Sequence, residues 1–468
     1  MGDLALIIPE ATVLLGAVVA LVLSVLGTPY RLTWRISVVM AIAGLAASIA
    51  WLGKSGEPFF PGIYNVDAFS QVLKVGITAG LFLSILIAGR PESVRERSRI
   101  DLPLFLFFST VGMMMVVSAT ELVTLYVALE LSAYGLYILA ALSKRHREGS
   151  EAAAKYVLFG AASSAVTLFG ISLVFGAART TLLADIAAQP ATPMLVVGVL
   201  LAIAGLLFKL AVFPFHAWAP DTYQGGPHES ITFIGTASKV AAVGVLARLL
   251  SLATPAPEAL VTVLLILCVA SMTVGNLAAI VQNDIKRFLA YSTVAQAGYI
   301  LIGLACWSQM GVASAIYYTV IYVPIVFCAF LVVCVLGADG SNPTKTTIAG
   351  LYGRSPLLAV ALLVSMFGLA GIPPTSGFLG KWFLFSAAVQ ADLLWLVVVG
   401  AINATVSLYY YLRIIKEAYL TPPADDTAIT VAPATAIAAW LGIALVIFFG
   451  FYPRPLWELA EAAAKIIG

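Results

Sequence analysis

Residues 365–385 read SMFGLAGIPPTSGFLGKWFLF, an apolar stretch that contains two adjacent prolines, four glycines and a single lysine, Lys381. Pro373 and Pro374 stand in its middle, where a proline removes a backbone donor and kinks or ends a helix. If the stretch crosses a membrane, such irregular backbone is tolerated only where it is buried in protein or lines a cavity. The stretch therefore predicts a broken membrane helix with a lysine just beyond the break.

The composition of the whole chain supports a membrane setting. Of the 468 residues, 61% are hydrophobic and 10% are charged, whereas soluble globular proteins have roughly 25% charged residues. Apolar runs of about 20 residues, the length that crosses a bilayer, fill nearly the whole chain. The fourteen expected spans are residues 4–26, 34–53, 66–89, 102–118, 120–142, 152–176, 193–218, 228–251, 259–282, 288–307, 311–336, 356–386, 391–420 and 429–451. We therefore predict an all-α polytopic membrane protein of about fourteen transmembrane helices, without a sizeable soluble domain.

The Lys and Arg residues are distributed unevenly between the loops. Counted with the flanking helix ends, the loops after odd-numbered spans hold fifteen of them and the loops after even-numbered spans hold three. Because cytoplasmic loops carry the excess of positive charge, we expect the odd loops to be cytoplasmic. An even number of spans then puts both termini on the outer side. The first span lacks a cleavage site and a basic flank, so we expect it to be retained.

Several charged side chains lie inside the predicted spans, where a charge at the bilayer centre costs at least ~2.5–3.5 kcal/mol. They are Lys74, Lys155, Lys209, Lys239, Lys381 and Glu130, with Glu10 at a shallower position. Such groups must face protein or a hydrated cavity, and by default they mark an ion pathway. Lys74 is the exception, because it is early in its span and can extend to the outer interface. A buried lysine can load and release a proton as a carboxylate partner moves, whereas an arginine cannot.

The opening stretch has a counterpart in the first half of the chain. Residues 208–214 read FKLAVFP and residues 367–373 read FGLAGIP, so Pro214 and Pro373 match in a shared frame F-x-L-A-x-x-P. The two copies lie in spans seven and twelve, which begin on opposite sides of the membrane. A weaker pair, SAYGLYILA at 132–140 and AQAGYILIG at 295–303, also has opposite orientations. Paired interrupted spans in two halves are typical of inverted-repeat transporters.

We therefore predict two inverted five-helix repeats, spans 4–8 and spans 9–13, each containing a broken helix. A chance match between short apolar strings is the alternative. The expected units are residues 1–101, 102–251, 259–420 and 421–468. The repeats are chemically unequal, because Glu130 aligns with Thr293 and Lys209 aligns with Gly368. The first half therefore resembles a Glu–Lys couple, and the second half has a lysine without a carboxylate.

Histidine and cysteine give weaker signals. His216 and His228 flank the loop AWAPDTYQGGPHES and are candidate proton relays at its cytoplasmic mouth, with a purely structural role as the alternative. The cysteines all lie in apolar spans and form no CxxC pair; they are Cys268, Cys306, Cys328 and Cys334. We therefore predict no metal or Fe–S site in this chain. The sequence also lacks a basic, aromatic nucleic-acid surface.

Four longer strings match a known family. FKLAVFPFHAWAPDTYQGGP, NDIKRFLAYSTVAQAGYILIG, GIPPTSGFLGKWFLF and SLYYYLRIIKEAY resemble the antiporter-like membrane subunits of respiratory complex I. The resemblance is strongest to the N subunit of the bacterial NADH:quinone oxidoreductase and extends to Mrp-type cation/proton antiporters. With the fourteen-span layout, it covers nearly the whole chain. One departure is GGPHESITF, which lacks the Thr-Pro-Val-Thr type of sequence expected after Gly-x-Pro and leaves the details of cytoplasmic proton uptake open.

The resemblance implies roles for individual residues. The family's key glutamate and its four lysines match Glu130, Lys155, Lys209, Lys239 and Lys381. Protons would enter from the cytoplasm near the loop between spans seven and eight, and Glu130 would hold Lys209 charged. The proton would then pass by way of Lys239 to Lys381 and leave outward. Lys155 would link Glu130 to its neighbours.

The resemblance also implies partners and a location. This chain would hold no cofactor, and NADH, FMN, Fe–S clusters and quinone would bind in partner subunits. It would lie in the bacterial inner membrane as part of a hetero-oligomer with other membrane-arm subunits. Two other functions remain open on the sequence: a subunit of a Mrp-type Na⁺/H⁺ antiporter without redox chemistry nearby, and a structural membrane subunit whose lysines serve assembly only.

Overall fold

The computed structural model describes residues 4–54, 60–144, 146–250 and 257–466. Within these ranges the chain forms helices and no strand, apart from isolated bridging residue pairs. The helices are η1 (Leu4–Ile7), α1 (Ile8–Val25), α2 (Tyr30–Ala50), α3 (Ala68–Ile87), η2 (Glu96–Ser98), α4 (Leu102–Ser118), α5 (Leu122–Ala141), α6 (His146–Ala178), α7 (Leu183–Ala187), α8 (Pro193–Ala202), α9 (Ala204–Leu210), α10 (Trp218–Gly225), α11 (His228–Gly235), α12 (Ala237–Leu250), α13 (Glu258–Ile280), α14 (Ile285–Ala305), α15 (Gln309–Leu336), α16 (Lys345–Ile348), α17 (Leu351–Arg354), α18 (Pro356–Ala370), α19 (Ser376–Gln390), α20 (Leu394–Leu420), α21 (Pro433–Phe451) and α22 (Arg454–Ala464). This confirms the predicted all-α fold.

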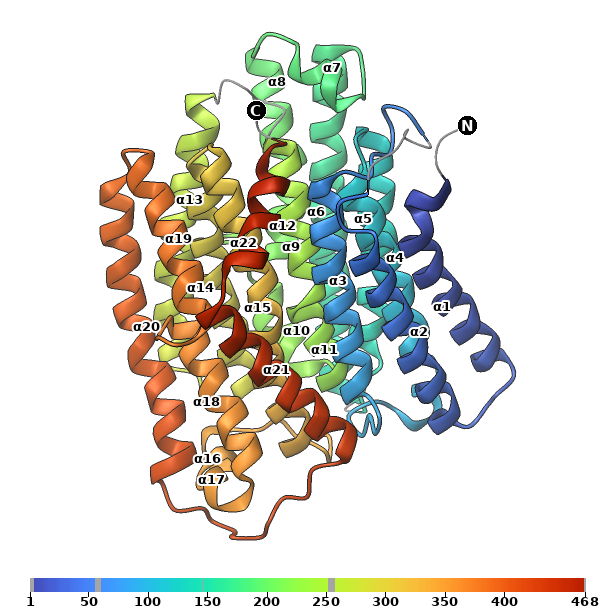
Figure 1. The fold of residues 1–468 in the computed structure, drawn as a ribbon, viewed down its shortest axis with the longest axis vertical. Helices are drawn as coiled ribbons and strands as arrows, with labels where there is room; N and C mark the ends of the chain where they lie inside the picture. Colours follow the sequence, from blue (N-terminus) through green and yellow to red (C-terminus); the bar gives the residue numbers. More distant parts are fainter. Residues whose placement is uncertain (1–3, 55–59, 145, 251–256, 467–468) are drawn as a thin grey trace.

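The long helices stand side by side in one bundle (Figure 1). The first helix begins and the last helix ends at the same end of the bundle, at the top of the view, and α16 and α17 lie at the opposite end. The helices α3, α12, α14 and α15 are buried along most of their length, whereas α2, α20 and α21 are largely exposed. The exposed side chains include many large apolar ones, such as Phe169, Trp395 and Trp440. Such an outer surface suits lipid or an apolar partner rather than water.

The predicted spans coincide with helices of membrane-crossing length. Among the described residues, twelve helices or helix pairs are long and apolar enough to cross a bilayer. Two shorter apolar helices, Leu102–Ser118 and Pro356–Ala370, occupy the positions of the remaining predicted spans. Each predicted range therefore has a counterpart, while the number of fourteen crossings stays a prediction.

Both predicted helix breaks are present. The helix α9 ends at Leu210 and is followed by Ala211 in the left-handed conformation, with φ +60°. The helix α18 ends at Ala370 and is followed by Gly371, also left-handed, with φ +84°. The turns that follow contain Pro214 in the first half and Pro373 and Pro374 in the second, before the chain resumes as α10 and α19.

The structural alignment of the two breaks differs by one residue from the alignment predicted by the sequence frame. The sequence frame pairs Ala211 with Ala370, but the left-handed residues that end the helices are Ala211 and Gly371. The structural counterpart of Lys209 is therefore Leu369, and the predicted pairing of Lys209 with Gly368 was wrong. The predicted alignment relied on a Leu-Ala dipeptide that both apolar strings contain. In the structure, the backbone turn occurs one residue later in the second copy.

A further interruption was not predicted. The span expected at residues 228–251 is divided into α11 and α12 by Thr236, whose φ of −114° and ψ of −84° are not helical. The helix α15 also contains Pro324 in its interior. Both irregularities lie in deeply buried helices, where an interrupted backbone must find its hydrogen-bond partners within the protein.

The helix α3 lies in the middle of the bundle although it belongs to the predicted N-terminal unit. A Cβ atom on Gly80 would lie 2.8 Å from the Cβ of Ala237, and one on Gly76 would lie 3.1 Å from Val240. These close approaches bring α3 against α12. A helix of the first expected unit therefore contributes directly to the centre of the bundle. The boundaries of the four expected units stay a prediction.

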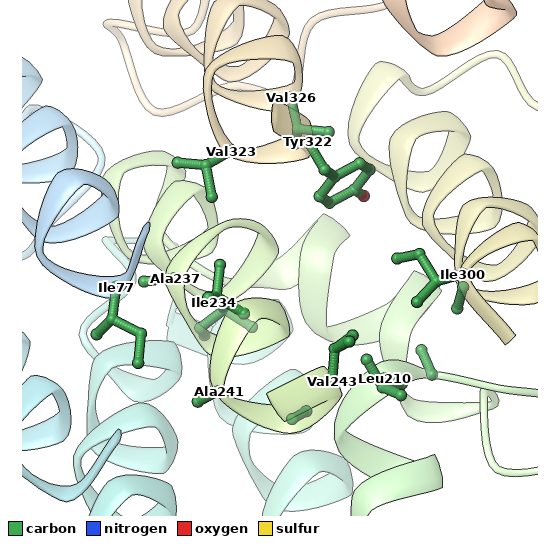
Figure 2. Close-up of a cluster of buried hydrophobic side chains, with 14 of the residues drawn as sticks. Ile77, Leu210, Ile234, Ala237, Ala241, Val243, Ile300, Tyr322, Val323 and Val326 are labelled. Carbon is green, nitrogen blue, oxygen red and sulfur yellow. The ribbon is translucent and has the colours of Figure 1, made fainter. Parts of the chain in front are cut away.

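Apolar side chains fill the seam where the two halves meet. Figure 2 shows Ile77 of α3, Leu210 of α9, Val243 of α12 and Ile300 of α14 around one cluster, with Tyr322 of α15 reaching its edge. These side chains are at most 2% exposed. Any charged group beside this cluster has no bulk water to bind, so its donors must be satisfied by protein atoms.

Candidate functional site

The lysine of the first break contacts the neighbouring helix α5. The Lys209 side chain is 8% exposed, and its Nζ donates to the Leu129 carbonyl at 3.0 Å and to Ser132 Oγ at 2.5 Å. Glu130 lies between these two residues and accepts a hydrogen bond from Ser164 of α6. Its charge acts on Lys209, but no ion pair joins the two among the described residues. The arrangement of Glu130 and Lys209 is therefore indirect, and the expectation that Glu130 holds Lys209 charged stays a prediction.

Lys239 binds the end of the broken helix. Its Nζ donates to the backbone carbonyl of Lys209 at 2.6 Å and lies 5.1 Å from the centroid of the Trp218 ring. The Trp218 Nε1 donates to the Phe208 carbonyl at 2.8 Å. The last carbonyls of a helix have no partner within it, and they form the negative end of its dipole. Lys239 and Trp218 therefore satisfy the end of α9, and the helix end in turn stabilises the Lys239 ammonium.

Lys381 makes the same kind of contact at the second break. Its Nζ donates to the carbonyls of Leu369 at 2.8 Å and Ala370 at 3.0 Å, which are the last residues of α18. The ammonium also lies 4.4 Å from the centroid of the Tyr299 ring, a distance at which a cation and an aromatic face attract. Since Leu369 is the structural counterpart of Lys209, each half contains a lysine ammonium on the equivalent carbonyl of its broken helix.

Neutral polar groups surround Lys381. Gln296 donates to the Leu369 carbonyl at 2.9 Å and to Tyr411 at 3.1 Å, and it accepts from Tyr318 at 2.5 Å. Thr293, which takes the sequence position of Glu130, lies 2.9 Å from the Tyr322 hydroxyl. The second half thus has hydroxyl and amide groups where the first half has a carboxylate.

Lys155 lies apart from Glu130. Its Nζ is 2.7 Å from Glu151 of the same helix and 2.7 Å from Asp221 of α10. Asp221 also pairs with Arg287 of α14 at 2.7 Å. A polar hollow of about 150 Å³ is lined by Lys155, Glu151 and Asp221 together with neighbouring residues. The structure therefore joins Lys155 to this charged group, and its expected role as a link between Glu130 and its neighbours stays a prediction.

The histidines lie in different surroundings. The His216 ring, in the turn between α9 and α10, packs 5.4 Å from Phe213 and 6.4 Å from Tyr291. His228 is 1% exposed at the start of α11, and its Nε2 lies 3.1 Å from the Gly337 carbonyl. Among the described residues, no group of three or more His, Cys, Asp or Glu side chains is arranged to hold a metal ion.

Lys74 was predicted to extend to the membrane interface, and this prediction was wrong. The residue is 1% exposed and forms an ion pair of 2.5 Å with Glu10 of α1. The Tyr64 hydroxyl donates to the same carboxylate. Because α3 is central, the ammonium is paired with a carboxylate of α1 inside the protein.

Comparisons with known proteins identify the family of this chain. The family model for the transmembrane region of NADH:quinone oxidoreductases and Mrp antiporters matches residues 119–407, which include both helix breaks. The chain belongs to this family. NADH-quinone oxidoreductase subunit N 2 of Syntrophobacter fumaroxidans is 45% identical over 439 residues, 92% of each chain. The subunit N 2 of Opitutus terrae is 40% identical over 455 residues, 95% of each chain.

Solved structures agree with this family assignment. A chain of respiratory complex I from Thermus thermophilus with bound aureothin is 31% identical, with a TM-score of 0.85 over 97% of this chain and 100% of that chain. A chain of the Mrp complex from Dietzia sp. is 21% identical, with a TM-score of 0.88 over 100% of both chains, and shares the fold. The antiporter-like architecture predicted from the sequence is thereby confirmed.

Several partners in the site were not predicted although their letters lie in the family's strings. Trp218 stands in FKLAVFPFHAWAPDTYQGGP, and Gln296 and Tyr299 stand in NDIKRFLAYSTVAQAGYILIG. A polar or aromatic residue within an apolar span was the available signal. It was not specific, because apolar spans of this chain contain many tyrosines.

Two charged residues that the sequence did not single out are deeply buried. In the structure, Lys286 is 1% exposed and Glu229 is 3% exposed, whereas Glu130 is only half-buried. Both residues lie at span ends, where the sequence cannot distinguish a solvated side chain from one covered by a neighbouring loop.

Proposed function

We propose that this chain is a proton-translocating subunit in the membrane arm of a respiratory NADH:quinone oxidoreductase. It would couple quinone reduction in partner subunits to outward proton movement through its buried Glu and Lys residues. The relatives named NADH-quinone oxidoreductase subunit N support the complex to which it belongs. The single observation that supports the proton path is the pair of equivalent sites, Lys239 on the Lys209 carbonyl and Lys381 on the Leu369 carbonyl.

The chemistry of these sites suits transient protonation. Backbone carbonyls and an aromatic ring hold each ammonium without an opposite full charge. When the proton leaves, the site therefore does not retain an unpaired buried carboxylate, which would be costly. Lys209 has a different environment, because Glu130 acts on it through space and Ser132 binds it directly. A small shift between α5 and α9 would change the charge stabilisation of Lys209 while leaving Lys239 attached to its backbone.

We assign the following sequence of steps to these residues. Protons reach the first half from the cytoplasm near the turn that contains His216 and the start of α11 at His228. A disturbance from the neighbouring subunit weakens the influence of Glu130 on Lys209, and the proton passes by way of Lys239 to Lys381 and leaves outward. Lys155, paired with Asp221, lies beside the polar hollow and would set the local charge there.

The proposal includes the setting of the chain. The chain would lie in the bacterial inner membrane with both termini on the outer side, beside other membrane-arm subunits. NADH, FMN, Fe–S clusters and quinone would bind in those partners and not in this chain. The breaks at Pro214, Pro373 and Pro374 would keep helix-end carbonyls available to the lysines.

The test is proton pumping by the purified complex in proteoliposomes. Lys209→Ala and Lys381→Ala should each lower the protons moved per quinone reduced by at least half while the complex still assembles. Lys465→Ala, at an exposed position near the C-terminus, is the control and should behave as wild type. Normal pumping by both variants would refute the proton path.

The same preparation separates the rival functions. Co-purification of the tagged chain with quinone-reductase subunits supports the proposal. Co-purification only with antiporter subunits, together with Na⁺-dependent proton flux that needs no quinone, would identify a Mrp-type antiporter instead. Loss of the complex in Lys209→Ala would point to a structural subunit.

A further inference from the structure

A buried carboxylate lies at the start of α11, in the segment GGPHESITF that departs from the family pattern. Glu229 is 3% exposed, and its carboxylate accepts a hydrogen bond from Ser93 Oγ. The same Ser93 oxygen accepts the backbone N–H of His228 at 2.9 Å. Ser93 therefore ties the loop after α3 to the first turn of α11 and orients the Glu229 carboxylate.

A buried imidazole and a buried ammonium complete this cluster. The Lys286 Nζ donates to the Gly226 carbonyl at 2.6 Å and lies 3.2 Å from His228 Nδ1. The His228 Nε2 lies 3.1 Å from the carbonyls of Gly337 and Ser341. Since carbonyls only accept hydrogen bonds, Nε2 carries the hydrogen and Nδ1 accepts from Lys286. His228 is therefore neutral, and Glu229 and Lys286 are the charge-bearing groups.

Four titratable groups interact electrostatically with Glu229. Lys286 and Arg99 are the cations whose charges act on the carboxylate. Tyr30 and Cys334 are the other titratable groups on which its charge acts. The nearby cations stabilise the carboxylate, and burial opposes its charge.

Two threonines lie between Glu229 and Lys239 in the chain. Glu229 and Thr232 are three residues apart in α11, Thr236 is the non-helical residue between α11 and α12, and Lys239 lies in the first turn of α12. The Thr232 hydroxyl donates to the His228 carbonyl at 2.8 Å, and the Thr236 hydroxyl donates to the Thr232 carbonyl at 2.7 Å. Two hydroxyl groups thus stand between the carboxylate and the lysine.

We propose that Glu229 is the carboxylate that takes up protons on the cytoplasmic side of the first half and passes them by way of Thr232 and Thr236 to Lys239. A proton from cytoplasmic water binds the Glu229 carboxylate and forms the carboxylic acid. It then moves through water and hydroxyl groups to a Lys239 that has released its own proton, which restores the carboxylate and the ammonium. No other bond changes and no electron moves. The step rests on the proposed function.

The competing explanation is that Glu229 only fastens the loop at Ser93 to α11. The variant Glu229→Gln separates the two, because an amide keeps an oxygen for the Ser93 hydrogen bond but cannot carry a proton. Glu229→Ala removes both the bond and the titratable group. Glu229→Asp keeps a titratable group on a shorter side chain. Glu96→Gln, at an exposed position of the neighbouring η2, is the matched control.

The experiment measures proton uptake and quinone reduction by the assembled complex in proteoliposomes. The proposal expects Glu229→Gln to lower the protons moved per quinone by at least two-fold, Glu229→Asp to recover part of this loss, and Glu96→Gln to match wild type. Full pumping by Glu229→Gln would overturn the proposal and leave Glu229 as a fastener of the loop at Ser93.

A reference variant keeps the two proposals distinguishable. Lys239→Ala is measured in the same preparation. If Lys239→Ala loses pumping and Glu229→Gln does not, only the uptake step is overturned. If Lys239→Ala also pumps normally, the proposed function fails and takes this step with it.

Discussion

The Lys239 ammonium lies 2.6 Å from the backbone carbonyl oxygen of Lys209, so one candidate lysine is bound to the helix end that carries the other. The bond uses the carbonyl and leaves the Lys209 side chain free to contact α5. Lys239 thereby responds to the position of the α9 backbone, while the Lys209 side chain responds to Ser132 and Glu130. The two lysines are therefore linked through the backbone of α9, and their charges are stabilised by different groups.

Lys381, the lysine at the second helix break, gives a direct test of proton release. Lys381→Arg keeps a positive charge at the end of α18, but a guanidinium does not deprotonate in a protein. We expect the complex to assemble and to move at most half as many protons per quinone. Lys54→Arg, an exposed change beside Trp51, is the control in the same assay. Normal pumping by Lys381→Arg would mean that Lys381 acts as a fixed charge.

Gly371 is required by both conformation and space. Its φ is +84°, and a Cβ atom there would lie 2.9 Å from Lys381 Cδ. Gly371→Ala should therefore cost at least the ~1–2 kcal/mol of a left-handed alanine and should displace the Lys381 side chain. The measurement is the thermal unfolding midpoint of the solubilised complex, together with its pumping. Gly353→Ala, where a Cβ would have nothing within 4 Å, should leave both unchanged, and equal behaviour of the two variants would contradict this assignment.

The Glu10–Lys74 pair predicts a characteristic pattern of stability. Removing one member of a buried ion pair typically costs about 3–5 kcal/mol because the other charge is left uncompensated. Lys74→Met and Glu10→Leu should each lower the unfolding midpoint strongly, whereas the double variant should recover much of the loss. A double variant that is less stable than either single one would show that the two side chains are not coupled.

Asp221 should matter more than Glu151, although both pair with Lys155. Asp221 is shared by Lys155 and Arg287, each at 2.7 Å, while the Glu151 side chain is 61% exposed. An exposed pair is worth about 0–1 kcal/mol. We therefore expect Asp221→Asn to lower the rate of proton uptake at least two-fold and Glu151→Gln to leave it nearly unchanged. A larger effect of Glu151→Gln would reverse this ranking.

The helix breaks were predictable because proline and glycine act locally on the backbone. Pro214 and Pro373 remove a donor wherever they stand, and Gly371 adopts a left-handed φ without a Cβ clash. The buried positions of Lys209, Lys239 and Lys381 were also predictable from their depth within long apolar spans. Local chemistry and span length were sufficient for these features.

The partners of the charged side chains were not predictable, because they come from distant parts of the chain. Lys74 is satisfied by Glu10 of α1, and Glu229 by Ser93 of the loop after α3. A span pattern gives depth along the membrane and does not say which helices are neighbours. The missing ion pair between Glu130 and Lys209 has the same cause, since the exact approach of α5 to α9 depends on packing.

The two helix breaks are closed by donors of different kinds. Across the first break, the indole N–H of Trp218 in α10 binds the Phe208 carbonyl of α9. Across the second, the ammonium of Lys381 in α19 binds the last carbonyls of α18. An indole hydrogen does not titrate, so the contact between α9 and α10 does not depend on proton occupancy, although Lys239 of α12 also binds the end of α9. If Lys381 gives up its proton as proposed, its hydrogen bonds to the end of α18 weaken, and α19 is then held less tightly against α18.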